Sequence, residues 1–211
     1  MKLLELNDTK SPYEHIANNI ISTCKPFLEL INYDTDEYVL YRGAGKSLNP
    51  VIILPGYRDN RKPRDIPIHL HAAINRVFKT KFGIPFRNGT FTTSNMSDAE
   101  TYSSTIYVVI PLGEFKFIWS PQISDLFNYL NRKTKDLFGT LTSLYHEEPK
   151  VIGTLLKYID TPEFESLYQN TNLRAGITSG HEVMLYADNC YYINCSEYTQ
   201  ISKLIQLNRT R

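Results

Sequence analysis

Proline determines where helices can begin in this chain, and it strongly constrains the fold. Because proline fixes φ and lacks a backbone N–H, it is tolerated in the first turn of a helix and disfavoured in the interior. We expect helices to begin at or just after five prolines, namely Pro12, Pro67, Pro121, Pro149 and Pro162. The first follows Ser11, a favourable cap, and is expected to reach about Cys24. The helix after Pro67 is expected to end near Lys81, ahead of Gly83, and a tail helix to span 197–207.

Short segments rich in β-branched and aromatic residues stand between these helices. We expect strands over 37–42 and 90–94, and a short strand or loop segment over 51–54. We also expect two hairpins, one pairing 104–111 with 114–119 and the other pairing 182–186 with 190–194. The segments follow no regular strand–helix–strand repeat, which predicts an α+β fold with a mainly antiparallel split sheet flanked by helices. No repeat or linker is visible. We therefore expect one domain over 1–211, with an N-terminal helix and a helical elaboration around 121–168.

Overall charge and composition exclude several classes of protein. The 211 residues carry a net charge of +1, so no global field attracts nucleic acid or an anionic membrane, and such a partner needs a local patch. No apolar run approaches the ~20 residues of a membrane span, and the first residues lack a signal-peptide core. The three cysteines are too few for a disulfide framework or a four-ligand zinc site. We expect a soluble cytoplasmic protein with reduced thiols and no metal.

Two strand-like segments each carry a charged residue at one end. Glu182 opens the apolar strand expected over 182–186, where a cleft can use its carboxylate. Arg42 lies at the end of another strand and is followed by Gly43. Arginine offers a planar fork for phosphate or carboxylate, and a glycine beside it lets a ligand approach the backbone closely. These two segments are candidates for one binding site.

A third segment carries consecutive hydroxyl groups. Thr92, Thr93 and Ser94 follow the aromatic Phe91 at the end of a short strand. A hydroxyl group both donates and accepts hydrogen bonds, so it can orient a carboxylate and also contact a ligand. This segment could complete a site with the arginine and the glutamate.

A basic loop carries four cations within seven residues: Arg58, Arg61, Lys62 and Arg64. Such a cluster is either a solvated surface turn or a patch that holds the phosphates of a nucleic acid or dinucleotide. The near-neutral charge of the whole chain makes a local cluster more notable. Both interpretations stay open at this point.

Three other motifs give weaker signals. The run 43–47 resembles the end of a phosphate-binding loop, but Leu40 stands where that motif needs a glycine. His69 and His71 point to different faces of a helix, so we expect one to be exposed and the other packed. Cys24 has no recognisable histidine–asparagine partners and is expected to be a buried or incidental thiol.

The arginine, hydroxyl and glutamate segments together resemble the signature segments of ADP-ribosyltransferases of the arginine–serine–glutamate class. In that family a first strand carries Arg-Gly, a second carries an aromatic residue followed by Ser-Thr-Ser, and a third carries the catalytic glutamate. The resemblance implies an ADP-ribosyltransferase-like fold, NAD as co-substrate and Glu182 as the catalytic residue. The NAD-binding residues that it implies are Arg42, Gly43, Thr92, Thr93 and Ser94.

The resemblance implies mono-ADP-ribosyl transfer to a macromolecule, either a nucleic acid such as RNA or a protein. Gly180 stands where the family often has Glu or Gln, and this disfavours an arginine acceptor. Phosphates of the acceptor could be held by Arg58, Arg61, Lys62 and Arg64. Such transferases are often toxins or phage effectors, and an antitoxin partner is an expectation only if this chain is a toxin. An NAD glycohydrolase is one alternative, and a non-enzymatic nucleic-acid-binding or assembly module is another.

Overall fold

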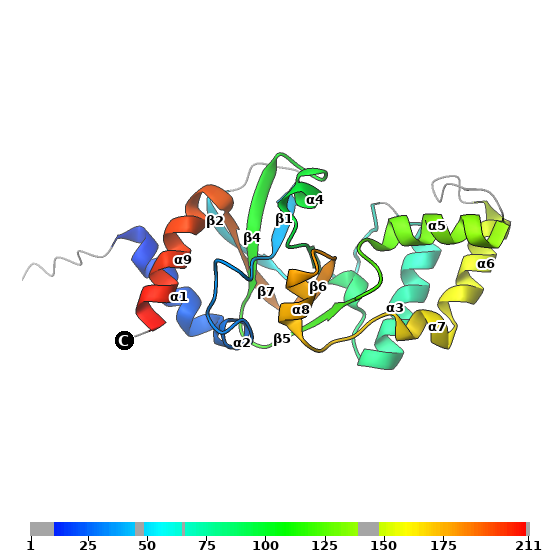
Figure 1. Cartoon of the computed structure of the whole chain (residues 1–211), viewed down its shortest axis with the longest axis horizontal. Coiled ribbons are helices and arrows are strands. Elements are labelled where there is room, and N and C mark those ends of the chain that lie inside the picture. The colour runs from blue at the N-terminus through cyan, green and yellow to red at the C-terminus, as the bar shows by residue number, and fades with distance from the viewer. Residues whose placement is uncertain (1–10, 45–48, 65, 139–147, 210–211) are drawn as a thin grey trace, which may run out of the picture.

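Two antiparallel sheets lie at the centre of the computed structural model, which describes residues 11–44, 49–64, 66–138 and 148–209 (Figure 1). One sheet has the strand order β1 (Tyr41–Ala44), β4 (Thr105–Pro111), β7 (Asn189–Asn194) and β2 (Val51–Pro55). The other has the order β3 (Thr90–Thr92), β6 (Val183–Ala187) and β5 (Phe115–Trp119). The expected architecture of antiparallel sheets flanked by helices is confirmed.

Helices gather at the two ends of the molecule (Figure 1). Beside the four-stranded sheet lie α1 (Pro12–Thr23), α2 (Lys25–Leu30) and α9 (Cys195–Arg209). At the opposite end lie α3 (Ile68–Phe82), α5 (Leu126–Phe138), α6 (Pro149–Ile159) and α7 (Pro162–Ser166). The short elements α4 (Met96–Glu100), α8 (Leu173–Thr178) and the 3₁₀ turn η1 (Phe86–Asn88) lie nearer the sheets. None of the described helices is both long and apolar enough to cross a membrane.

The three-stranded sheet lies between two hydrophobic clusters. Successive side chains of a strand point to opposite faces of its sheet. Accordingly, Val183 and Leu185 pack into the cluster shared with the four-stranded sheet, whereas Met184 packs into the cluster of α3, α5, α6 and α7. Trp119 and Ile118 on β5 divide in the same way. Glu182, which directly precedes Val183, therefore lies at the boundary between the two hydrophobic clusters.

Both predicted hairpins are wrong, because each pair of successive strands is divided between the two sheets. β4 is flanked by β1 and β7, and β5 pairs with β6. Likewise β6 is flanked by β3 and β5, and β7 by β4 and β2. Both edges of β4, β6 and β7 are thus occupied by other strands, which leaves no edge for a hairpin partner. The chain passes from one sheet to the other after β4 and again after β6. These two connections lie side by side, because the Leu112 N–H donates to the carbonyl of Asn189 (3.0 Å).

The predicted helix starts at Pro12, Pro149 and Pro162 are confirmed, and α3 ends at Phe82 before Gly83, whose φ is +77°. The start predicted at Pro121 is wrong, because α5 begins at Leu126. Tertiary contacts occupy carbonyls that a helix starting at Pro121 would have used: that of Ser120 lies 2.8 Å from the Nδ1 atom of His181, and that of Ser124 accepts from the N–H of Glu182 (2.9 Å). Asp125 then caps α5 by accepting from the N–H of residue 128 (2.7 Å).

The strand predicted over 37–42 begins only at Tyr41 and continues to Ala44. Gly43, expected to break the strand, lies within it. A Cβ at Gly43 would lie 2.3 Å from the carbonyl oxygen of Ala99 on α4, so the close packing of α4 against β1 requires this glycine. Residues 45–47 of the phosphate-loop-like run lie outside the described residues.

Candidate functional site

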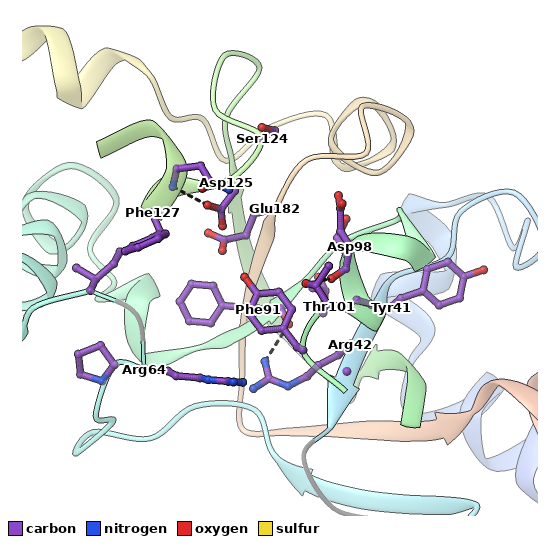
Figure 2. Close-up of a pocket in the computed structure, with 18 of the residues that line it drawn as sticks. Tyr41, Arg42, Arg64, Phe91, Asp98, Thr101, Ser124, Asp125, Phe127 and Glu182 are labelled. Carbon is purple, nitrogen blue, oxygen red and sulfur yellow. Dashed lines mark hydrogen bonds between the residues drawn. The ribbon is translucent and has the colours of Figure 1, made fainter. Parts of the chain in front are cut away.

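A cavity of about 450 Å³ lies where the two sheets meet the helical end of the molecule (Figure 2). Its walls come from β1, β3, η1, α4, the start of α5, the residue before β6, and residues 61, 63, 64 and 66 between β2 and α3. The sheets are joined at its base, because Tyr41 and Thr93 exchange two backbone hydrogen bonds with N–O distances of 2.6 and 3.0 Å. Arg42 and Thr92 consequently lie beside each other in the wall.

Glu182 projects into this cavity just before β6. Its N–H donates to the carbonyl of Ser124 (2.9 Å), which ties it to the turn before α5. One carboxylate oxygen lies 3.7 Å from the Nη1 atom of Arg87, an ion-pair distance beyond normal hydrogen-bond length. Burial raises the pKa of Glu182 to about 7, and Asp125 adds to the rise while Arg87 opposes it. The carboxylate is therefore poised between its two protonation states at neutral pH.

Three arginines contact Phe91, two of them over its ring and one at its backbone carbonyl. Arg42 donates from Nη1 to the Phe91 carbonyl (2.9 Å), while the guanidinium groups of Arg61 and Arg87 lie 3.9 and 4.5 Å from the ring centroid. Arg61 also donates to the carbonyl of Gly89. Burial lowers the pKa of Arg61 to about 9, and the positive charges of Arg42 and Arg87 add to this effect. Such mutual repulsion favours an anionic ligand among these groups.

Arg87 is the most buried member of this cluster, with its side chain 8% exposed. Its Nε atom is buried and has no hydrogen-bond partner among the described residues. An unpaired buried donor is costly, so a site for an anion or for water beside Arg87 would satisfy it.

The hydroxyl segment fixes the chain around Glu182. Thr92 donates to the carbonyl of Val183 (2.8 Å), Thr93 donates to that of Gly180 (3.0 Å), and Ser94 donates to that of Ile177. These bonds hold the backbone on both sides of Glu182. Thr92 and Thr93 line the cavity, whereas Ser94 is not among its lining residues.

The basic loop does not act as one patch. Arg61 and Arg64 line the cavity beside Glu182, whereas Lys62 lines a second hollow along α3 that Arg61 also reaches. Arg58 lines neither hollow. Its backbone N–H donates to the carbonyl of Asn88 (2.9 Å). The loop therefore forms the partition between two hollows.

Both carboxylates and guanidinium groups line the cavity, and apart from Arg87, which lies beside Glu182, the two kinds lie mostly on different sides. Figure 2 shows the carboxylates of Asp125 and Glu182 on one side and the guanidinium groups of Arg42 and Arg64 on the other. Asp98, on α4, adds a third carboxylate to the lining. Within the described part of the chain, no group of three His, Cys, Asp or Glu side chains is arranged to hold a metal ion, and Cys24, Cys190 and Cys195 are free.

Sequence reasoning missed Arg87, Asp98 and Asp125. The local signal for Arg87 was its place directly before the Asn88-Gly89 turn that opens the hydroxyl strand. Asp98 stands in the first turn of a short helix capped by Asn95, and Asp125 caps α5. An aspartate at either of these helix positions is explained by helix stability alone. Only the tertiary fold identifies Asp98 and Asp125 as residues that line the cavity.

Comparison of this chain with protein-family models, with curated proteins and with solved structures finds no match.

Proposed function

We propose that this chain is an NAD-dependent mono-ADP-ribosyltransferase with an ADP-ribosyltransferase-like split sheet and with Glu182 as its catalytic residue. The observation that carries the proposal is the convergence of Glu182, Arg42 and Thr93 on one cavity from three segments far apart in the sequence. The cavity volume of about 450 Å³ is within the usual range for small-molecule sites. The residues thus brought together belong to the segments that carry the family resemblance.

The distribution of charge supports NAD as the ligand. NAD carries an anionic pyrophosphate and a cationic nicotinamide ring. The cluster of Arg42, Arg61 and Arg87 suits the pyrophosphate, and the unpaired Nε of Arg87 offers a further donor. The carboxylates of Glu182 and Asp125 suit the ribose and the cationic ring. A dinucleotide lying across the cavity would meet complementary charge at both ends.

Glu182 would act on the bond between nicotinamide and ribose. This C–N bond breaks with its electron pair left on the nicotinamide nitrogen, which neutralises the ring. The acceptor's lone pair forms a new bond to the same ribose carbon, and the acceptor loses a proton. Positive charge develops on the ribose in an oxocarbenium-like transition state, as in glycoside hydrolysis. An ionised Glu182 would stabilise that charge, and Thr92 and Thr93 would hold its backbone in place.

The pKa of Glu182 adds a condition to this mechanism. With a pKa of about 7, roughly half of the carboxylates are ionised at neutral pH. The proposal requires the ionised form, so activity rises as the pH rises through about 7.

Incubation with NAD labelled in the adenosine half, together with a cell lysate, tests the proposal. Label transferred to nucleic acid or protein supports the transferase and identifies the acceptor. Release of nicotinamide with free ADP-ribose, without transfer, favours an NAD glycohydrolase. If NAD is not consumed at any pH between 6 and 9, the proposal fails and a non-enzymatic binding module is favoured.

A further inference from the structure

A second hollow, of about 860 Å³, runs along one face of α3. The helix contributes residues spaced three and four apart, which is the spacing of a single helix face: Ile68, His71, Ala72, Asn75, Arg76 and Lys79. At 1.5 Å per residue, this face extends for about 17 Å. The hollow is therefore much longer than a single phosphate group and suits an extended ligand.

The lining of this hollow is basic. It contains Arg61, Lys62, Arg76 and Lys79, with Asp59 as the only described acidic side chain. Arg76 is already paired with Asp160, at 2.7 Å. Lys62 and Lys79 are exposed and form no ion pair with any described residue. Because the whole chain carries a net charge of only +1, this concentration of cations is local.

The floor of the hollow is polar and neutral. His71 is buried, and its Nε2 atom lies 3.3 Å from both the Asn88 Oδ1 and the Asn75 Nδ2 atoms. Burial lowers the pKa of His71 to about 4, so its ring is uncharged at neutral pH. No Phe, Tyr or Trp is among the described lining residues. The hollow therefore lacks the aromatic anchors typical of protein interfaces and of base stacking.

The hollow adjoins the cavity beside Glu182. Within the loop, Lys62 lines the second hollow, Arg64 lines the cavity and Arg61 lines both. A chain lying along α3 would therefore meet Arg61 at the border of the first cavity.

We propose that this second hollow binds the phosphodiester backbone of a nucleic-acid strand, which serves as the ADP-ribose acceptor. Lys62 and Lys79 contact phosphates along α3, and the strand reaches the cavity across Arg61. The role as acceptor rests on the proposed transferase function, whereas binding of the strand does not. Without aromatic stacking in the hollow, binding is independent of base sequence.

Fluorescence anisotropy with short single-stranded RNA and DNA of mixed sequence tests the site at several salt concentrations, with and without NAD. The test variant is Lys62→Gln/Lys79→Gln, and the matched control is Lys116→Gln/Lys203→Gln. The control residues are exposed on β5 and α9 and give the same change in net charge. Each phosphate contact contributes a slope of about 0.7 in the logarithmic dependence of affinity on salt. Losing two contacts should weaken binding about 25-fold at about 0.1 M salt and reduce the slope by about 1.4.

The outcomes separate this inference from the proposed function. The site is supported if only the test variant binds the strand more weakly and if NAD does not displace the strand. Comparison of the affinities for RNA and DNA identifies the preferred strand. Equal weakening in both double variants, displacement by NAD, or absence of binding by the unmodified chain overturns it. Transfer of label to protein alone overturns the role as acceptor. Strand binding through Lys62 and Lys79 without NAD cleavage leaves the nucleic-acid site standing and removes the transferase.

Discussion

Replacing Glu182 by Gln should make the folded protein more stable at neutral and alkaline pH. The folded-state pKa of Glu182 is about 7, against 4.5 for the unperturbed group. Because the folded value is the higher one, the carboxyl costs no stability below about pH 4.5, stability falls as the pH rises from there to about 7, and the loss is complete above that pH. At 1.36 kcal/mol per pH unit, this difference amounts to about 3 kcal/mol above pH 7. Gln is uncharged, as the protonated carboxyl is, and does not incur this loss.

Denaturant unfolding of both proteins between pH 4 and pH 8 measures the effect. The variant should be about 3 kcal/mol more stable at pH 8, equivalent to a rise in Tm of roughly 6–12 °C for a chain of this size. The two proteins should converge near pH 4. Glu114→Gln, at an exposed turn, is the matched control and should differ from the unmodified protein by less than about 0.5 kcal/mol. The quantity to compare is the difference in unfolding free energy between the variant and the unmodified chain. If this difference is no larger at pH 8 than at pH 4, burial does not hold this carboxylate at a high pKa.

Three further predictions concern residues around the cavity. Arg87→Gln removes the cation 3.7 Å from Glu182 and should raise the midpoint of the pH–activity profile by about 1–3 pH units; an unchanged midpoint would contradict this ion pair. Gly43→Ala places a Cβ against the Ala99 carbonyl and should destabilise the protein by about 1–3 kcal/mol in denaturant unfolding; full stability would show that α4 can move away. Thr93→Val removes the hydrogen bond to the Gly180 carbonyl and should lower the free energy of unfolding by about 1–2 kcal/mol and also lower kcat. A normal kcat would argue against a role for Thr93 in holding Glu182.

Helix starts were predictable from the sequence because their causes are local. Pro12 and Pro149 act within their own first turns, and Gly83 ends α3 by its own backbone conformation. Pro121 misled because residues distant in the sequence, His181 and Glu182, contact the carbonyls of Ser120 and Ser124 that a helix would have used.

The sheet pairing was not predictable in the same way. A short connection such as the one around Gly113 is compatible with a hairpin, and only the occupancy of the β4 edges by β1 and β7 excludes it. The site followed the same division. Glu182 was identifiable from its place at the start of a strand, and Arg42 from the Arg-Gly pair, although its strand continues past it, whereas Arg87 enters the cavity through the packing of η1 between α3 and β6.

Nicotinamide release from NAD by the purified chain, compared with Glu182→Gln and Glu114→Gln at pH 8, tests the central claim most directly. Both variants must first show cooperative unfolding. The account predicts that Glu114→Gln keeps the activity of the unmodified chain, and that Glu182→Gln loses at least 10²–10³-fold, as expected for loss of one electrostatic contact to the transition state. Equal nicotinamide release by a folded Glu182→Gln protein would contradict the assignment of this carboxylate as the catalytic residue.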